Sequence, residues 1–322
     1  MWKPSLLSLA LCAGLSQAAL AQAQWPNERV IKIVVASSAG GGTDTVARVL
    51  ANELARPIGQ QFVVENRPGA GNVRGSDVVA KSAPDGYTLL MSASTLAINH
   101  VMYKQLPYDV ARDFAPITQM VSLPNVLVVG MGTPFRSFGD FLSAARAKPG
   151  ALTYGSAGLG TAPHMAMELL RVSAGIDVLH VPYTGVAPAL NDIIGNRVDG
   201  MLVNFLSAKP QIDGGTLRAL AMSSSARSRF MPDLPTISES GVPGYEAIQW
   251  FGLLAPAGTP QAIIDRLQAE TAKILDTPAM KARLALEGAE PIGNTPAEFS
   301  ALIKAEMAKW SQVAKAAGIK PE

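Results

Sequence analysis

The sequence predicts an α/β protein of two lobes with a ligand cleft between them. Short β-branched strands alternate with amphipathic helices, which is the order produced by right-handed βαβ units and a parallel sheet. A strand, a Gly/Ser loop and a helix occur in this order at 31–54 and again at 152–172. The chain has 322 residues, enough for two separate hydrophobic cores.

The composition is that of a globular protein and argues against a nucleic-acid partner. Hydrophobic residues make up 48% of the chain and charged residues 16%. The formal net charge is only +2, and no run of basic residues supports binding to a polyanion.

The N-terminus is predicted to be a secretory signal peptide spanning residues 1–21. Lys3 supplies the positive start, and Leu6 to Leu20 form a nearly uncharged stretch rich in Leu and Ala. Small residues place the cleavage site after Ala21 or after Ala23. The alternative is an uncleaved anchor helix, but the apolar stretch is shorter than the roughly 20 residues that a membrane span needs.

The only cysteine, Cys12, lies inside the predicted signal peptide. Leu11 precedes it, where a lipid attachment site needs a small residue, so we expect no lipid. The mature protein then has no thiol, which excludes thiol catalysis and cysteine metal sites. We therefore expect a soluble periplasmic protein.

The first part of the mature chain is predicted to form three strand–helix units. Residues 30–36 are a β-branched run typical of a buried parallel strand, and residues 43–54 repeat apolar side chains at helical spacing. Further strands are expected at 61–65 and 87–91, and further helices at 72–81 and from about 95 to 102.

A second series follows, in which Gly and Pro mark most of the boundaries. Strands are expected at 125–129, 152–154, 178–181, 200–204, 218–222 and 250–255. Helices are expected at 137–147, about 163–173, 260–275 and 296–316, and an irregular connection at 226–246. The aromatic residues Trp250 and Phe251 are expected in the core.

The glycines Gly40 to Gly42 lie between a predicted strand and a predicted helix. Consecutive glycines at such a position allow the backbone to come close to a ligand. No lysine follows them as a P-loop requires, and Thr45 stands where a dinucleotide fingerprint needs its third glycine. N–H groups at a helix start still attract anions, and a carboxylate suits such a loop. The alternative is a plain turn whose glycines only allow close packing.

The loop at 155–161 could instead hold a nucleophile. Tyr154 occupies the place of the first glycine of a nucleophile elbow before Ser156, although His164 could act as its base. The three histidines lack metal-binding spacing. We therefore expect no catalytic residue, no metal site and no cofactor.

Seven motifs in one order resemble those of a known family. They are GGGTD at 40–44, VVENRPGAG at 63–71, APDGYTLL at 83–90, LPYDVARDFAPIT at 106–118, YGSAGLGTAPH at 154–164, HVPYTGVAPALNDIIGNRVDG at 180–200 and WFGLLAPAGTP at 250–260. Together they resemble the Bug-type extracytoplasmic substrate-binding proteins of tripartite tricarboxylate transporters, from about Trp25 to the C-terminus.

The resemblance implies a type II periplasmic-binding-protein fold, with two α/β lobes joined by two crossing strands. Lobe 1 would comprise 24–122 and 248–322, and lobe 2 would comprise 123–247. It also implies a monomer that binds a small carboxylate and docks on membrane transporter subunits. The implied ligand-binding residues are Ser37, Ser38, Gly41, Thr43, Ser94, Thr95, Ser156, Ala157, Gly158, Thr161, His164, Tyr183, Val203 and Asn204.

Two departures from the family pattern bear on the ligand. Ala36 to Ala39 replace a Pro-Phe pair, which makes the first wall smaller and more polar. The strand ending near residue 203 lacks the usual acidic side chain, and Val203 would face the cleft in its place. Amino acids should then bind worse than neutral-bodied, di- or tricarboxylic or aromatic acids, because a buried ammonium would lack a partner. Alternatively, Val203 lies one residue off the cleft and belongs to the core.

We therefore expect a solute-binding protein rather than an enzyme. One alternative is a serine esterase that uses Ser156. Another is a solute sensor for a membrane kinase, which would have the same cleft.

The predicted processing has a direct test. The mature protein should begin at Gln22 or Gln24 and carry no lipid, since both candidate cleavage sites remove Cys12. Intact-mass measurement of periplasmic material checks this, and a mass that retains Cys12 would contradict it.

Overall fold

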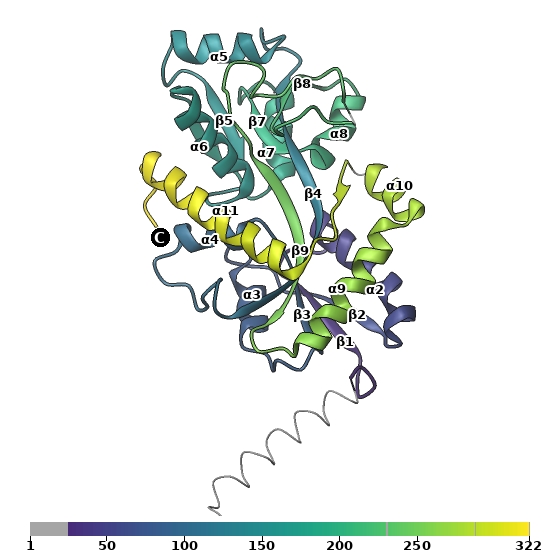
Figure 1. The fold of residues 1–322 in the computed structure, drawn as a ribbon. Coiled ribbons are helices and arrows are strands. Elements are labelled where there is room, and N and C mark those ends of the chain that lie inside the picture. The colour runs from purple at the N-terminus through teal and green to yellow at the C-terminus, as the bar shows by residue number, and fades with distance from the viewer. Residues whose placement is uncertain (1–24, 230, 287, 322) are drawn as a thin grey trace, which may run out of the picture.

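The computed structural model describes residues 25–229, 231–286 and 288–321, and shows two α/β lobes that meet along a pair of long strands (Figure 1). The two-lobed α/β architecture predicted from the sequence is confirmed. The predicted signal peptide, its cleavage sites and Cys12 lie outside the described residues. Within the described ranges, no helix is both long enough and apolar enough to cross a membrane.

The strands and helices alternate through most of the chain. The strands are β1 (Ile31–Val35), β2 (Phe62–Asn66), β3 (Thr88–Ala93), β4 (Phe114–Gly130), β5 (Thr153–Ser156), β6 (Leu179–Pro182), β7 (Met201–Asn204), β8 (Leu217–Met222), β9 (Ile248–Pro256) and β10 (Glu290–Pro291). The helices are α2 (Gly42–Ile58), α3 (Val73–Ala80), α4 (Thr95–Met102), α5 (Phe138–Ala147), α6 (Ala162–Ala174), α7 (Val186–Ile194), α8 (Phe205–Asp213), α9 (Gln261–Asp276), α10 (Pro278–Leu286) and α11 (Pro296–Ala316).

The first lobe is built on a sheet in which β1 runs parallel to both β2 and β3. The strand order is β10-β4-β9-β3-β1-β2, and β9 is antiparallel to both of its neighbours. Helices α2, α9 and α10 cover one face, and α3, α4 and α11 cover the other. Because β1 and β3 are parallel, the loops that follow them lie at the same edge of the sheet, where ligands of such sheets bind.

The second lobe is built on the C-terminal part of β4, Asn125 to Gly130. That part pairs with β7 and β8, while β5 and β6 form a parallel pair beside them. A bridge between Tyr154 and Gly200 connects the pair to the start of β7. Helices α5 and α6 pack on one face of this lobe, and α7 and α8 pack on the other.

Strands β4 and β9 cross from one lobe to the other, as Figure 1 shows. Strand β4 is 17 residues long, whereas the sequence predicts a strand only at 125–129. The β4–β9 ladder runs from Phe114 opposite Pro256 to Pro124 opposite Ile248. The predicted lobe boundaries therefore fall inside β4 and directly before β9.

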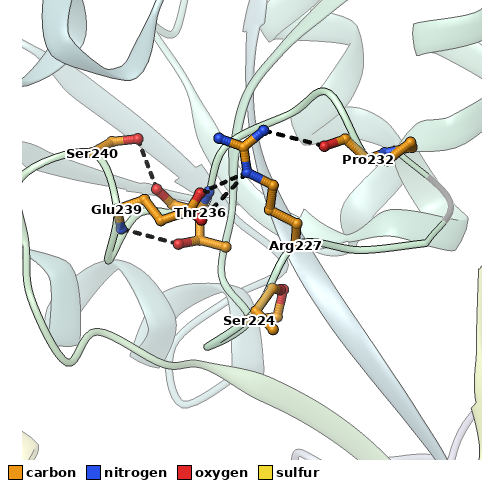
Figure 2. Close-up of polar contacts among 7 residues, drawn as sticks. Ser224, Arg227, Pro232, Thr236, Glu239 and Ser240 are labelled. Atoms are coloured by element: carbon orange, nitrogen blue, oxygen red, sulfur yellow. Dashed lines mark hydrogen bonds and ion pairs between the residues drawn. The ribbon is translucent and has the colours of Figure 1, made fainter.

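The irregular connection between β8 and β9 is held by its own polar contacts (Figure 2). The Arg227 Nε lies 3.0 Å from a carboxylate oxygen of Glu239. The same carboxylate accepts a hydrogen bond from the Thr236 N–H, and the Thr236 hydroxyl accepts one from the Glu239 N–H. The Ser240 hydroxyl donates to the Thr236 carbonyl. These contacts give a segment without helix or strand a defined path.

Helices α7, α8 and α10 are absent from the sequence-based prediction. All three are nine residues long and contain a proline, Pro188 in α7, Pro210 in α8 and Pro278 in α10. Helix α8 also follows β7 without an intervening loop, because Asn204 both ends the strand and caps the helix. A loop that would separate the helix from the strand in the sequence is therefore missing at α8.

The expectation that Val203 faces the cleft is wrong. Its side chain is fully buried and packs in the core between β4, α7 and α8. Val203 lies opposite Val126 on β4, and the next residue, Asn204, lies opposite Asn125. Since alternate residues of a strand point to opposite faces, Asn204 reaches the cleft and Val203 does not.

The position of Val203 predicts the result of two substitutions. Val203→Ala should destabilise the protein by about 2 kcal/mol, through lost burial and a small cavity. Val203→Asp should cost several kcal/mol more, because its carboxylate would be buried without a partner. Urea unfolding of both variants checks this, and an Asp variant as stable as the Ala variant would contradict the core placement.

Candidate functional site

A cleft of about 800 Å³ lies between the lobes, at the edge where β1 and β3 end. This volume is within the range usual for small-molecule sites. Among the described residues that line it, none carries a charge. Lobe 1 contributes Ser37 to Thr43, Pro68, Gly69, Gly71, Asn72, Ala93 and, from β9, Gln249 and Phe251; lobe 2 contributes Ala157, Thr184 to Ala187, Leu190, Asn191, Asn204, Ser207 and Gln211.

The first wall of the cleft is the start of α2. The N-cap residue is Gly41, which has no side chain to satisfy the first N–H groups of the helix. Gly40 has a φ of +82°, a left-handed conformation that glycine adopts without strain. A Cβ on Gly42 would lie 3.2 Å from the ring of Phe251, so a side chain there would crowd the cleft. The glycines thus leave the helix N-terminus open to a ligand.

Asp44 fixes this loop without adding net charge to the cleft. Its carboxylate accepts hydrogen bonds from the Gly40 N–H at 2.9 Å, from Arg48 at 3.0 Å and from Asn66 at 2.9 Å. Burial alone would raise the pKa of Asp44, but the bonds from Arg48, Gly40 and Asn66 outweigh it and lower the pKa. Asp44 is therefore ionised, and its negative charge is paired with Arg48 rather than left free to repel a bound anion.

The second wall is the start of α7, which the sequence-based prediction missed. Gly185 is its N-cap and again offers no capping side chain. Thr184 to Ala187 line the cleft together, whereas the loop before α6 contributes only Ala157. One signal could have identified this wall: Thr184 and Gly185 follow a short strand and precede an apolar helix, as the loops at 37–43 and 155–161 do.

The arrangement suits an anion more than a cation. Two helix starts, one from each lobe, expose N–H groups whose partial positive charge favours negative ligands. The described lining contains no carboxylate side chain that could pair with an ammonium group. Between the walls, Phe251 and Leu190 supply apolar surface for the body of a ligand. Phe251 lies in the core, as expected, and also lines the cleft.

The structure places the predicted site residues in two groups. Those on the cleft are Ser37, Ser38, Gly41, Thr43, Ala157 and Asn204. The others do not line this cleft; they are Ser94, Thr95, Ser156, Gly158, Thr161, His164, Tyr183 and Val203. Some of these hold the lining in place: the Thr95 hydroxyl accepts a hydrogen bond from Asn72 at 2.8 Å. The Tyr183 hydroxyl donates to Asp192 at 2.7 Å, which leaves it unsuited to reach a ligand.

Ser156 pairs with a different histidine from the one predicted. Its Oγ lies 2.6 Å from the Nε2 of His180, which the parallel pairing of β5 with β6 brings alongside. His164 instead accepts a hydrogen bond from the Gly160 N–H at 3.2 Å. Ser156 is fully buried, and its hydroxyl also accepts the Gly158 N–H at 3.0 Å. This contact fixes the loop and does not favour a nucleophile in the cleft.

The rings of His164 and His180 stack inside the second lobe, where α6 packs against β5 and β6. The rings of His164 and His180 lie 4.3 Å apart, and the ring of Tyr154 lies 4.8 Å from that of His180 and 6.5 Å from that of His164. Burial lowers the pKa of both histidines to about 4, with Arg171 contributing at His164 and the neighbouring ring at His180. The Gly160 bond also requires an unprotonated Nδ1 on His164. Both rings are therefore neutral at pH 7.

Comparison with known proteins yields a consistent set of matches. The chain matches the model of the tripartite tricarboxylate transporter family receptor over residues 46–319. It is 37% identical to protein BugT of Bordetella pertussis over 294 residues, which cover 91% of this chain and 90% of BugT. The structure of R. palustris Rpa4515 with adipate is 38% identical, covers 92% of this chain and 100% of that chain, and has a TM-score of 0.85. MatC from Rhodopseudomonas palustris with bound malate is 31% identical, covers 89% and 99%, and has a TM-score of 0.79.

The histidine stack predicts a loss of stability in mild acid. With folded pKa values of about 4, below the roughly 6.5 of an unfolded histidine, the unfolded state binds more protons as the pH falls. The free energy of unfolding should therefore decrease from about pH 6.5 to about pH 4, by up to about 3 kcal/mol for each histidine.

Urea unfolding at pH 7 and pH 4.5 measures this decrease. A His164→Gln, His180→Gln double variant should lose less stability on acidification than the wild-type protein. His100→Gln is the control, because His100 is exposed and outside the stack. An equal acid-induced loss in the double variant and the control would show that the stack is not responsible.

Proposed function

The chain belongs to the tripartite tricarboxylate transporter receptor family, and on this premise we propose that its cleft captures a small carboxylate for delivery to the membrane subunits of such a transporter. The Bug-type resemblance read from the motifs is thereby confirmed. The observation that carries the proposal is that two helix starts without capping side chains, those of α2 and α7, line one uncharged cleft.

The lining supports a neutral-bodied di- or tricarboxylic or aromatic acid as the ligand. Similar proteins were solved with adipate and with malate, and both ligands are carboxylates. Apolar surface from Phe251 and Leu190 suits the body of such an acid. Amino acids are disfavoured, as the motifs suggested, but the reason is that the described lining lacks an acidic side chain rather than that Val203 faces the cleft.

We place the protein in the periplasm as a processed monomer. The receptor family and the predicted signal peptide support this location. Capture would proceed by closure of the lobes about β4 and β9, because a ligand that touches both walls binds the closed arrangement more tightly than the open one. Docking on the transporter would then follow closure.

Esterification of the ligand tests carboxylate capture. Titration calorimetry with adipate, malate and benzoate should identify binding acids, and methyl-esterifying a bound carboxylate should weaken binding by about 2–3 kcal/mol. The ester removes the negative charge that strengthens hydrogen bonds from backbone N–H groups. Dimethyl adipate is the matched probe for adipate, because it keeps the same chain length and removes the charge of both equivalent carboxylates, and methyl benzoate is the matched probe for benzoate. Equal affinity for an acid and its ester would contradict the proposal.

A further inference from the structure

Gln249, at the floor of the cleft, has an amide group whose orientation is fixed by its neighbours. The Ala247 carbonyl can only accept, so the Asn125 atom 2.6 Å from it is the nitrogen. The Oδ1 of Asn125 must then be the atom that faces Gln249, and it too can only accept. The atom of Gln249 at 2.8 Å is therefore Nε2, which leaves Oε1 for the cleft.

Asn125, which fixes the orientation of Gln249, is itself held by several hydrogen bonds. Gln249 and Asn125 are both buried, and the Asn125 backbone exchanges hydrogen bonds with Ser223. The Ser223 hydroxyl donates to the same Ala247 carbonyl at 2.6 Å. Turning the Gln249 amide over would place two oxygens against each other. No described residue donates to Oε1 of Gln249, so it is an acceptor available to a ligand.

Asn204 has the opposite fixed orientation. The Ser207 N–H can only donate, so the Asn204 atom 2.9 Å from it is Oδ1, which caps α8. The Nδ2 of Asn204 is left as a donor at the cleft. Asn204 lies opposite Asn125 on one side of β4, while Gln249 bonds Asn125 from the other side. A fixed donor and a fixed acceptor thus flank the same point of the floor.

We propose that Gln249 and Asn204 recognise a hydroxyl group on the bound carboxylate, a specificity that rests on the carboxylate capture proposed above. A hydroxyl donates one hydrogen bond and accepts others, so it satisfies both residues at once. An ammonium group can only donate, so it cannot accept the hydrogen bond from Asn204. A ketone or a second carboxylate can only accept, so it cannot donate to Gln249. An unsubstituted CH₂ would leave both amide groups without partners, which disfavours the acid that lacks the hydroxyl.

Matched acid pairs that differ by one hydroxyl test the proposal in titration calorimetry. The pairs are succinate and malate, adipate and 3-hydroxyadipate, and benzoate and 4-hydroxybenzoate. The wild-type protein should bind the hydroxylated member of at least one pair about tenfold more tightly. In that pair, Gln249→Met and Asn204→Ser should each reduce the preference to about twofold or less, because the hydroxyl loses one partner and the unsubstituted acid no longer leaves that amide group unpaired.

The variants separate recognition from folding. Asn204→Ser keeps a side chain that caps α8 while deleting the amide donor, so it tests the pair even if Gln249→Met fails to fold. Gln261→Met, on the exposed start of α9, is the control and should keep the full preference. Binding of acids without a hydroxyl preference, or a preference that survives both substitutions, overturns the hydroxyl site and leaves carboxylate capture intact. Failure of every acid to bind overturns both.

Discussion

The antiparallel pairing of β4 with β9 is the contact on which the rest of the structure depends. These strands belong to both lobes, since β4 pairs with β9 in the first lobe and with β7 and β8 in the second. The pairing also places Gln249 and Phe251 at the cleft floor. Because β9 pairs with β3 as well, the ends of β3 and its neighbour β1 stay at the cleft edge. Closure of the lobes must therefore bend these two strands.

A further constraint comes from the lining of the cleft, which must bind an anion without a cationic side chain among the described residues. A buried arginine would carry a desolvation cost, whereas helix N–H groups are already held in place by the helix. The one carboxylate in the first turn of α2, Asp44, is neutralised by Arg48 outside the cleft. Because the described lining has no acidic side chain either, an ammonium group would have no partner there. Selectivity among acids then depends on neutral amide groups such as those of Gln249 and Asn204.

The sequence predicts the elements with strong local signals and fails where long-range pairing decides. Helix α11 has its capping box at Thr295 and Glu298, and it forms where its spacing indicates. The pairing of Ser156 with His180 joins residues that are 24 positions apart, so no local pattern reveals it. Which of Val203 and Asn204 faces the cleft depends on one residue of register. The glycine-rich start of α2 was recognisable, whereas the start of α7 offered only Gly185.

The central claim is that backbone N–H groups, rather than side chains, hold the ligand carboxylate. Val186→Pro tests it most directly, because proline removes the first N–H of α7 yet fits the first position of a helix. The extended conformation of Gly185 suits a residue before proline. Calorimetric titration with the tightest-binding acid should show about tenfold weaker binding for Val186→Pro and near-normal binding for Val186→Ala. Equal affinities of the two folded variants would contradict the claim.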